Sequence, residues 1–423
     1  MSRPEKRSLL WAGEVARLLL GFSTLALLAR SAGAEVLGTY LSVIAVLLLL
    51  PRLLDCGLPH ALGYFLRVNP KGLRAGSLLI ARHIALATPM AILLAYGLRY
   101  FPFANESATA LVQEHWLILT LLILSELALL LGLASFIPTA RFKAYLGTIV
   151  LPPLLFFAVL VYWLRTSPGT APEPAQLLGL LLVASLTGVA LMTAGLTRAG
   201  LQGAQSPFPV RSAYHFGFRS HGAAVAKIAA QRFDRLFLAA VLGAAGYAQY
   251  SLAISVRDMA TFPANLYAMT LRNRQIDLIV RHQDLTAARS VLRRVSFTWL
   301  ALALTGALVL FPLWPIIVRL AFGPAYAATS QFVQIVAFSC APLAIMGFAW
   351  NHLFALNLPG RVTVLTSVSL AMAIPTFLLF IHLSGPTKGV AIAVVVWSVA
   401  TAAASLGWAL ASKQAQPPRT IPS

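Results

Sequence analysis

Long apolar stretches recur from one end of the chain to the other, and short polar connections separate them. Each stretch has the roughly 20 apolar residues that a helix needs to cross the hydrocarbon core of a bilayer. The pattern therefore predicts an all-α polytopic membrane protein with about twelve spanning helices. We predict these spans at 8–30, 36–56, 78–100, 115–137, 145–164, 176–197, 222–243, 247–270, 297–318, 328–350, 361–383 and 388–411.

The composition agrees with this pattern. Of the 423 residues, 59% are hydrophobic and only 10% are charged, whereas a soluble domain is about 25% charged. This excludes a soluble enzyme, a nucleic-acid factor and a secreted disulfide scaffold. Cys56 and Cys340 lie in or beside apolar stretches, and neither they nor the eight histidines show metal-ligand spacing. We therefore expect no metal and no cofactor.

The net charge is +20, and the positions of the cations along the chain indicate the orientation of the protein in the membrane. If the N-terminus is cytoplasmic, the inner connections hold 21 of the 32 Lys and Arg residues, the outer connections hold five and the spans hold six. Cytoplasmic connections are enriched in Lys and Arg. The sequence thus predicts that both termini face the cytoplasm. The basic connection 272–296 reads either as an amphipathic surface helix or as a solvated connector.

Two segments half a chain apart resemble each other. Residues 15–46 align without a gap on residues 225–256, with nine identities in 32 positions that include Gly33 with Gly243 and Tyr40 with Tyr250. Six predicted spans separate the copies, an even number, so both copies have the same orientation. The pattern predicts two six-helix lobes related by a parallel repeat, an arrangement that transporters use with a substrate site between the repeats.

Ionisable side chains within spans are costly and mark functional positions. The repeat places Arg17 over Lys227, so two cations at equal depth are expected to face a central cavity. We interpret the cations as a cavity lining that binds an anionic ligand, since Arg suits phosphate. The acids are candidates for ion coupling or counter-charge, and Arg52 with Asp55 is expected to be a structural pair whose two charges can be exchanged. The candidate cavity cations are Arg17, Lys227, Arg232, Arg235 and Arg257, and the candidate coupling acids are Glu14, Glu126, Asp234 and Asp258.

Packing alone remains an alternative for several of these groups. Glu14 and Arg17 are i,i+3 neighbours and can pair within one helix. The charges of span 7 can instead form a structural network with Glu126 or Asp258. The sequence does not decide which acid, if any, carries a proton or Na⁺.

A set of landmark residues recurs along the chain at Ala29-Arg30, Gly33, Gly38–Tyr40 and Asp55–Gly57, then at Asp234 and Tyr250, and finally at Gly323-Pro324 and Tyr326. In these residues and their spacing, in span count and in topology, the chain resembles the Wzx-type polysaccharide flippases. Ser31-Ala32 replaces the Leu-Leu that commonly precedes the glycine corresponding to Gly33. This departure affects a structural turn and no functional residue.

This resemblance implies a member of the multidrug/oligosaccharidyl-lipid/polysaccharide exporter superfamily, with a V-shaped pair of lobes around a central cavity and alternating access. The implied cargo is an O-antigen or exopolysaccharide repeat unit on undecaprenyl pyrophosphate, flipped to the periplasmic leaflet of a bacterial inner membrane with H⁺ or Na⁺ coupling. Implied partners are membrane lipids, a polysaccharide polymerase and a chain-length regulator, but no nucleic acid. We expect no enzymatic activity.

The expected organisation is a first lobe at 1–200, a cytoplasmic linker at 201–221, a second lobe at 222–412 and a disordered tail at 413–423. Two other readings stay open. One is a related exporter that carries the peptidoglycan precursor or cationic drugs, although peptidoglycan-precursor flippases usually have fourteen spans. The other is a membrane polymerase or ligase, which the short outer connections disfavour.

Overall fold

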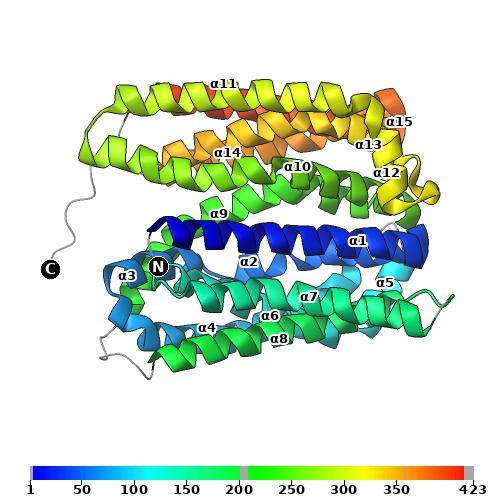
Figure 1. Ribbon diagram of the computed structural model, residues 1–423, viewed down its shortest axis with the longest axis horizontal. Helices are drawn as coiled ribbons and strands as arrows, with labels where there is room; N and C mark the ends of the chain where they lie inside the picture. The colour runs from blue at the N-terminus through cyan, green and yellow to red at the C-terminus, as the bar shows by residue number, and fades with distance from the viewer. Residues whose placement is uncertain (1–2, 104, 168, 201–207, 357, 414–423) are drawn as a thin grey trace. The chain divides into compact units, whose positions relative to one another are not determined.

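The computed structural model describes residues 3–103, 105–167, 169–200, 208–356 and 358–413. The helices form two compact units. Unit 1 comprises Met1–Val225 with Arg235–Ala248, and unit 2 comprises Ala226–Asp234 with Gln249–Ser423. Within each unit the long helices run side by side (Figure 1). Most of the predicted tail, 414–423, lies outside the described residues.

Unit 1 is built around α6, which packs against α2, α3, α4, α7 and α8. Helix α6 is apolar on every side and buries residues all around its axis, as expected for a helix with neighbours in all directions. α1 packs against α5, α7 and α8 at its edge. The helices of this unit are α1 (Arg3–Leu47), α2 (Leu50–Leu54), α3 (Leu58–Val68), α4 (Leu73–Gly97), α5 (Glu106–Glu114), α6 (Trp116–Phe136), α7 (Phe142–Thr166) and α8 (Pro174–Gly200).

Unit 2 is built around α14, most of which is buried against α11 and α15. Phe348, Trp350 and Leu353 of α14 form the centre of its core. α9 contributes residues to both units. The remaining helices are α9 (Val210–Ala239), α10 (Ala244–Ile276), the π-helical turn η3 (Asp277–Arg281), α11 (Leu285–Leu310), α12 (Trp314–Phe322), α13 (Thr329–Val336), α14 (Cys340–Ala355) and α15 (Pro359–Ala411).

Two glycines divide the longest helices. A straight helix of 53 residues, the length of α15, would be about 80 Å long, far more than the roughly 30 Å of a hydrocarbon core. Gly385 breaks α15 and Gly33 breaks α1, with nearly identical backbone angles (φ 76°, ψ 168° and φ 76°, ψ 167°). Both breaks fall between pairs of spans that the apolar pattern predicts.

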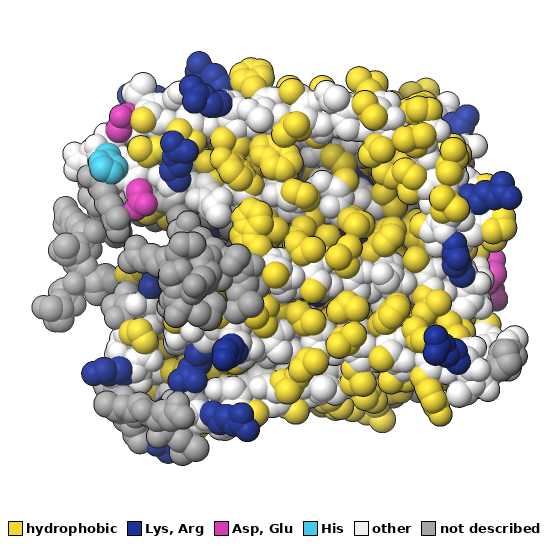
Figure 2. All heavy atoms as spheres, viewed as in Figure 1, with side chains coloured by type: hydrophobic (Ala, Val, Ile, Leu, Met, Phe, Trp, Pro, Cys, Tyr) yellow, Lys and Arg dark blue, Asp and Glu magenta, His cyan; other side chains and the backbone are white. Residues whose placement is uncertain are grey.

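All twelve predicted spans fall on helices. Nine helical stretches of the described residues are long and apolar enough to cross a membrane, and the first, Leu10–Leu54, contains two predicted spans. The other two predicted spans lie on α9 and α10, which are less apolar and are not among the nine. Hydrophobic side chains cover the middle of the long helices, and Lys and Arg gather near their ends (Figure 2). The protein is a multi-pass membrane protein.

Several predicted connections are helical. α9 begins at Val210, inside the predicted linker, of which 201–207 lie outside the described residues. The basic connection 272–296 contains the end of α10, the π-helical turn η3 and the start of α11. The two repeat-matched glycines each lie where long helical segments meet, Gly33 inside α1 and Gly243 between α9 and α10.

Candidate functional site

The densest cluster of buried charge lies in unit 2, where α9 faces α10. Asp234 is 6% exposed and Arg257 is also 6% exposed. Tyr250 donates a 2.5 Å hydrogen bond to Asp234 Oδ2, and Arg257 Nη1 lies 3.8 Å from the same oxygen. The Arg257 guanidinium also donates to Asp258 Oδ1, with its Nη2 at 2.9 Å. Asp234, Tyr250, Arg257 and Asp258 form what we call the α9–α10 charge cluster.

The structure therefore joins four of the residues that the sequence singled out. Asp258 is 46% exposed at its side chain, so the cluster extends from a buried acid to an accessible one. Arg257 contacts both acids and compensates two carboxylates with one guanidinium. This arrangement satisfies a buried cation that would otherwise be very costly in an apolar environment. Asp234 of α9 is thus linked to Asp258 of α10 through Arg257.

Three cations of α9, Lys227, Arg232 and Arg235, are half-buried. Lys227 Nζ lies 5.5 Å from the ring centroid of Trp350 on α14, a cation–π contact within unit 2. Arg232 and Arg235 follow on the next turns of the same helix. Trp350 is a contact that the sequence did not reveal, because nothing in its surroundings along the chain marks it as a partner of a distant lysine.

In unit 1, Glu14 and Arg17 pair within α1. Arg17 Nη2 lies 2.9 Å from Glu14 Oε2, and Tyr145 of α7 donates a 2.6 Å hydrogen bond to Glu14 Oε1. The side chain of Arg17 is 50% exposed and that of Glu14 is 20% exposed. The carboxylate is thus held by its own unit, while the guanidinium remains accessible. The sequence did not reveal Tyr145 as a partner of Glu14, because the two residues are 131 positions apart.

Glu126 lies on the central helix α6 and is half-buried. It accepts a 2.8 Å hydrogen bond from Ser185 of α8. Arg52 and Tyr40 are close enough to interact with it electrostatically. The repeat-matched tyrosines thus share a property: Tyr40 lies near a carboxylate in unit 1, and Tyr250 is bonded to one in unit 2.

The predicted pair of Arg52 and Asp55 exists but is loose, with 3.9 Å between Nη1 and Oδ2. Asp55 is 3% exposed and makes shorter contacts elsewhere. Its Oδ1 accepts a 2.7 Å hydrogen bond from the Gly57 amide and lies 3.1 Å from His221 Nδ1 on α9. The main role of Asp55 is therefore to hold the turn before α3 and the first part of α9, rather than to neutralise Arg52.

This junction, which we call the α3–α9 junction, contains two more contacts. His83 of α4 bonds through Nε2 to the Leu54 carbonyl at 2.8 Å and through Nδ1 to Tyr214 Oη at 3.1 Å. Gly57 and Gly217 allow the backbones of the α3 turn and α9 to touch, since a Cβ at Gly57 would overlap the Gly217 carbonyl. Sequence reasoning missed this junction because its two halves are some 160 positions apart.

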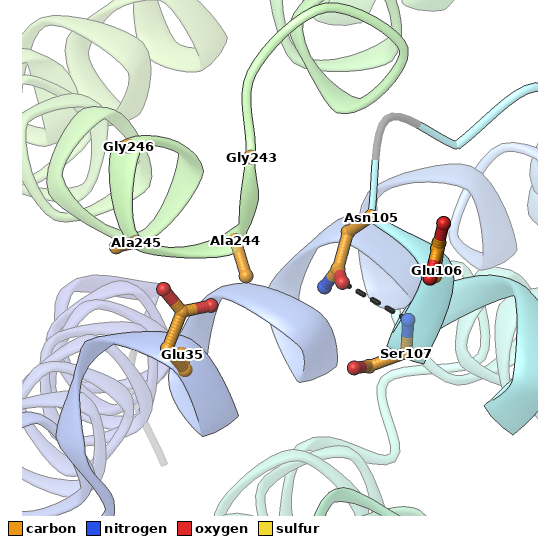
Figure 3. A pocket seen from close by; sticks show the side chains of 8 residues that line it. All are labelled: Glu35, Asn105, Glu106, Ser107, Gly243, Ala244, Ala245 and Gly246. Atoms are coloured by element: carbon orange, nitrogen blue, oxygen red, sulfur yellow. Dashed lines mark hydrogen bonds between the residues drawn. The ribbon is translucent and has the colours of Figure 1, made fainter.

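An open hollow of about 400 Å³ lies elsewhere in unit 1. Glu35 of α1 and Asn105 and Glu106 at the start of α5 face Gly243 and the first residues of α10 across it (Figure 3). Asn105 accepts a hydrogen bond from the Ser107 amide and caps α5. The hollow contains none of the predicted site residues, and the described residues include no group of three or more His, Cys, Asp or Glu side chains arranged to hold a metal ion.

No family model matches the chain, and no curated protein matches it. Solved structures do. A multidrug resistance MATE family transporter of the MOP superfamily, in its inward-facing conformation, matches with a TM-score of 0.73 and 11% identity over 93% of each chain. The Vibrio cholerae MATE transporter VcmN in its bent form matches with a TM-score of 0.63 and 17% identity over 96% of this chain and 97% of that one.

The lipid II flippase MurJ, in an inward closed conformation, is also similar, with a TM-score of 0.63 and 13% identity over 94% of this chain and 87% of that chain. Identities this low establish the fold rather than the activity. All three neighbours are transporters or flippases, and the matches extend over nearly the whole chain. The protein has the all-α fold that the MATE and MurJ transporters of the MOP superfamily share.

Proposed function

We propose that the protein is a membrane exporter whose cargo is an oligosaccharide linked to undecaprenyl pyrophosphate, an O-antigen or exopolysaccharide repeat unit. It carries this cargo from the cytoplasmic to the periplasmic leaflet of a bacterial inner membrane by alternating access, coupled to H⁺ or Na⁺. The fold supports an exporter, and the sequence resemblance to Wzx-type flippases supports the cargo. The charges of the spans favour an anionic cargo over a cationic one.

The observation that carries the proposal is that the carboxylates of the predicted spans already have hydrogen-bond partners. Each of the five already binds a donor of its own unit. Such acids are poorly placed to receive a cationic drug, which needs a carboxylate that can exchange its partner for the ligand. The five pairs are Glu14 with Arg17 and Tyr145, Asp55 with Gly57 and His221, Glu126 with Ser185, Asp234 with Tyr250, and Asp258 with Arg257.

On α9 and α10, cations outnumber acids. α9 and α10 contain eight Lys and Arg residues but only two acids. Both of these acids, Asp234 and Asp258, lie within 4.0 Å of Arg257. A pyrophosphate carries several negative charges, and Arg and Lys replace the water around it through charge-assisted hydrogen bonds. In the proposed function Lys227, Arg232 and Arg235 of α9 bind the pyrophosphate.

The second candidate is a related exporter of the peptidoglycan precursor or of drugs. Its support is the fold shared with the MurJ flippase, described as a flippase for lipid II, and with multidrug resistance transporters. The peptidoglycan precursor is also a lipid-linked pyrophosphate, so the cations do not separate it from the leading cargo. A direct comparison of cargoes does.

The experiment uses the purified full chain in proteoliposomes that contain a lipid-linked oligosaccharide. An impermeant reagent that modifies sugars reports the glycan exposed at each leaflet, with and without a pH or Na⁺ gradient. We expect protein-dependent exposure that K227Q/R232Q/R235Q abolishes. The matched control R67Q/R74Q/R165Q removes the same charge from exposed side chains and should retain flipping.

Three outcomes contradict the proposal in different ways. Equal flipping by both triple variants would show that the α9 cations do not bind cargo. Flipping of lipid II but of no other glycan would favour the second candidate. No flipping of any glycan, together with uptake of a cationic drug by the same vesicles, would identify a drug exporter.

A further inference from the structure

Two guanidinium groups of unit 2 converge on one residue at the end of α15. Arg289 of α11 donates from Nη2 to the Ser412 carbonyl at 2.9 Å. Arg361, near the start of α15, donates from Nη1 to the Ser412 hydroxyl and lies 5.8 Å from the ring centroid of Trp408. Both acceptors are neutral. Among the described residues, no carboxylate lies within 4.0 Å of either guanidinium.

Helix capping explains only part of this arrangement. Ser412 is the C-cap of α15, and cations are favourable at helix C-termini. The C-terminus of a helix carries roughly half a negative charge, which compensates a fraction of two full positive charges. Two like charges brought to one residue repel each other. An anion bound between them would remove that repulsion.

Three side chains near this end of unit 2 also have buried polar atoms without a hydrogen-bond partner among the described residues. His352 of α14 and Gln275 of α10 are both 0% exposed. Neither ring nitrogen of His352 and neither side-chain polar atom of Gln275 is bonded, and the same holds for Nε of Arg289. Buried polar atoms are nearly always hydrogen-bonded, and a bound polar ligand would supply partners to this group of atoms.

The helix faces bring these residues together. Leu271 of α10 lies four positions before Gln275, and Ile279 of the π-helical turn η3 lies four positions after it. Leu271 belongs to the core that contains Leu292 of α11 and Leu353 of α14. Ile279 belongs to a second small core that contains Ala288 and Ala355.

Gln275 thus lies between two cores to which α11 and α14 both contribute. Arg289 follows Ala288 on α11, and His352 precedes Leu353 on α14. The charge of Arg289 also acts electrostatically on His352. The three side chains therefore share one level of unit 2, beside Ser412 and Arg361.

We propose that Arg289 and Arg361, together with His352 and Gln275, form an anion site at the α10–α11–α14–α15 end of unit 2 that binds a phosphate-type oxyanion. The guanidinium groups supply charge and paired N–H donors, and the imidazole and the amide supply further N–H donors. Both arginines are half-buried, so an anion can reach them, while His352 and Gln275 form the closed inner wall. The site shares no residue with the α9 cations of the proposed cargo path.

The chemistry fits free phosphate and the phosphate of an anionic phospholipid headgroup equally. The test therefore has two arms on the full chain in detergent and in nanodiscs. In the first arm, equilibrium binding of radiolabelled inorganic phosphate measures affinity and stoichiometry. In the second, the thermal unfolding midpoint is compared in nanodiscs of phosphatidylcholine and of phosphatidylglycerol, since a ligand that binds only the folded state raises the midpoint.

The decisive variant is R289Q/R361Q, and the matched control is R293Q/R294Q. The control lies on the same helix α11, removes the same charge and affects exposed side chains. A third variant, R289K/R361K, retains the charge but loses the paired donors and guards against misfolding of the glutamine variant. Circular dichroism confirms the helical content of each.

We expect the native chain to bind one phosphate, or to unfold at a higher temperature in phosphatidylglycerol than in phosphatidylcholine. R293Q/R294Q should respond as the native chain does. The affinity should be about tenfold weaker in R289K/R361K, and the response should be lost in R289Q/R361Q. A response to phosphatidylglycerol alone would identify the headgroup as the source, and a response to both probes would show that they share the site. The proposal is overturned if neither probe affects the native protein. It is equally overturned if R289Q/R361Q responds as R293Q/R294Q does.

Discussion

Tyr250 donates a 2.5 Å hydrogen bond to Asp234, and the Arg257 guanidinium lies 3.8 Å from the same carboxylate oxygen. Tyr250 is fully buried, and Asp234 is nearly so. The bond links α9 to α10 inside unit 2 and keeps a charged carboxylate compensated from two directions. Because the partners are 16 positions apart, the bond fixes how the two helices meet at this level.

Removing the hydroxyl should weaken unit 2 without changing its packing. A hydrogen bond to a charged group contributes about 1.5–3 kcal/mol, so Tyr250→Phe should lower the free energy of unfolding by that amount. Equilibrium unfolding in mixed micelles measures the loss. Tyr267→Phe, also on α10, is the matched control and should change stability less. Equal losses in the two variants would contradict a special role for the Tyr250–Asp234 bond.

Exchanging the charges of Arg52 and Asp55 should damage the protein. The exchanged residue at position 55 cannot accept the hydrogen bonds that Asp55 receives from the Gly57 amide and His221. Loss of these two bonds should cost about 2–4 kcal/mol. Asp55→Asn keeps an accepting oxygen and should cost less. Thermal unfolding of the two variants tests this, and an exchanged protein as stable as the native one would restore the view that the ion pair dominates.

Alanine substitutions at three glycines distinguish the cost of backbone strain from the cost of steric overlap. Gly33→Ala meets no neighbouring atom but forces alanine into a conformation that only glycine adopts readily, which should cost about 1–3 kcal/mol. Gly57→Ala adds an overlap with the Gly217 carbonyl to a left-handed conformation and should cost more. Gly21→Ala, in ordinary helix with open space around it, should stabilise by about 0.5–1 kcal/mol. Thermal unfolding midpoints of the three variants check this order. A Gly57→Ala variant at least as stable as Gly33→Ala would contradict the close backbone contact at the α3–α9 junction.

The thiol of Cys56 should react slowly. Burial raises its pKa above the usual value, and the negative charge of Asp55 raises it further. Because the thiolate is the nucleophile, a raised pKa leaves less of the reactive form at pH 7–8. The rate of reaction with a maleimide should increase about tenfold for each pH unit over this range.

The measurement uses a Cys340→Ala background, in which Cys56 is the single cysteine. Asp55→Asn removes the smaller of the two causes and should lower the pKa of Cys56, so labelling at pH 8 should become faster by a few-fold. Slower labelling in that variant would show that Asp55 acts on Cys56 through access rather than charge.

The apolar pattern by itself determined where the helices are. Helices that face lipid must satisfy every backbone hydrogen bond internally, so about 20 consecutive apolar residues suffice to define a span without knowledge of its neighbours. Gly33 and Gly385 lie in the short gaps between predicted spans, but only the structure shows that the backbone takes a positive φ at both. The span charges were visible in the sequence, because a charged residue stands out within an apolar stretch.

Only the tertiary structure decided what those charges contact. Asp55 pairs with His221 across 166 positions, and Glu14 with Tyr145 across 131. Neither separation along the sequence follows from a helical period. Neither partner differs in type from dozens of other polar residues along the chain. The Arg289–Ser412–Arg361 arrangement depends on how three helix ends meet. Periodicity reports which face of a helix is apolar, whereas the choice between two polar partners depends on packing that brings distant segments within about 3 Å.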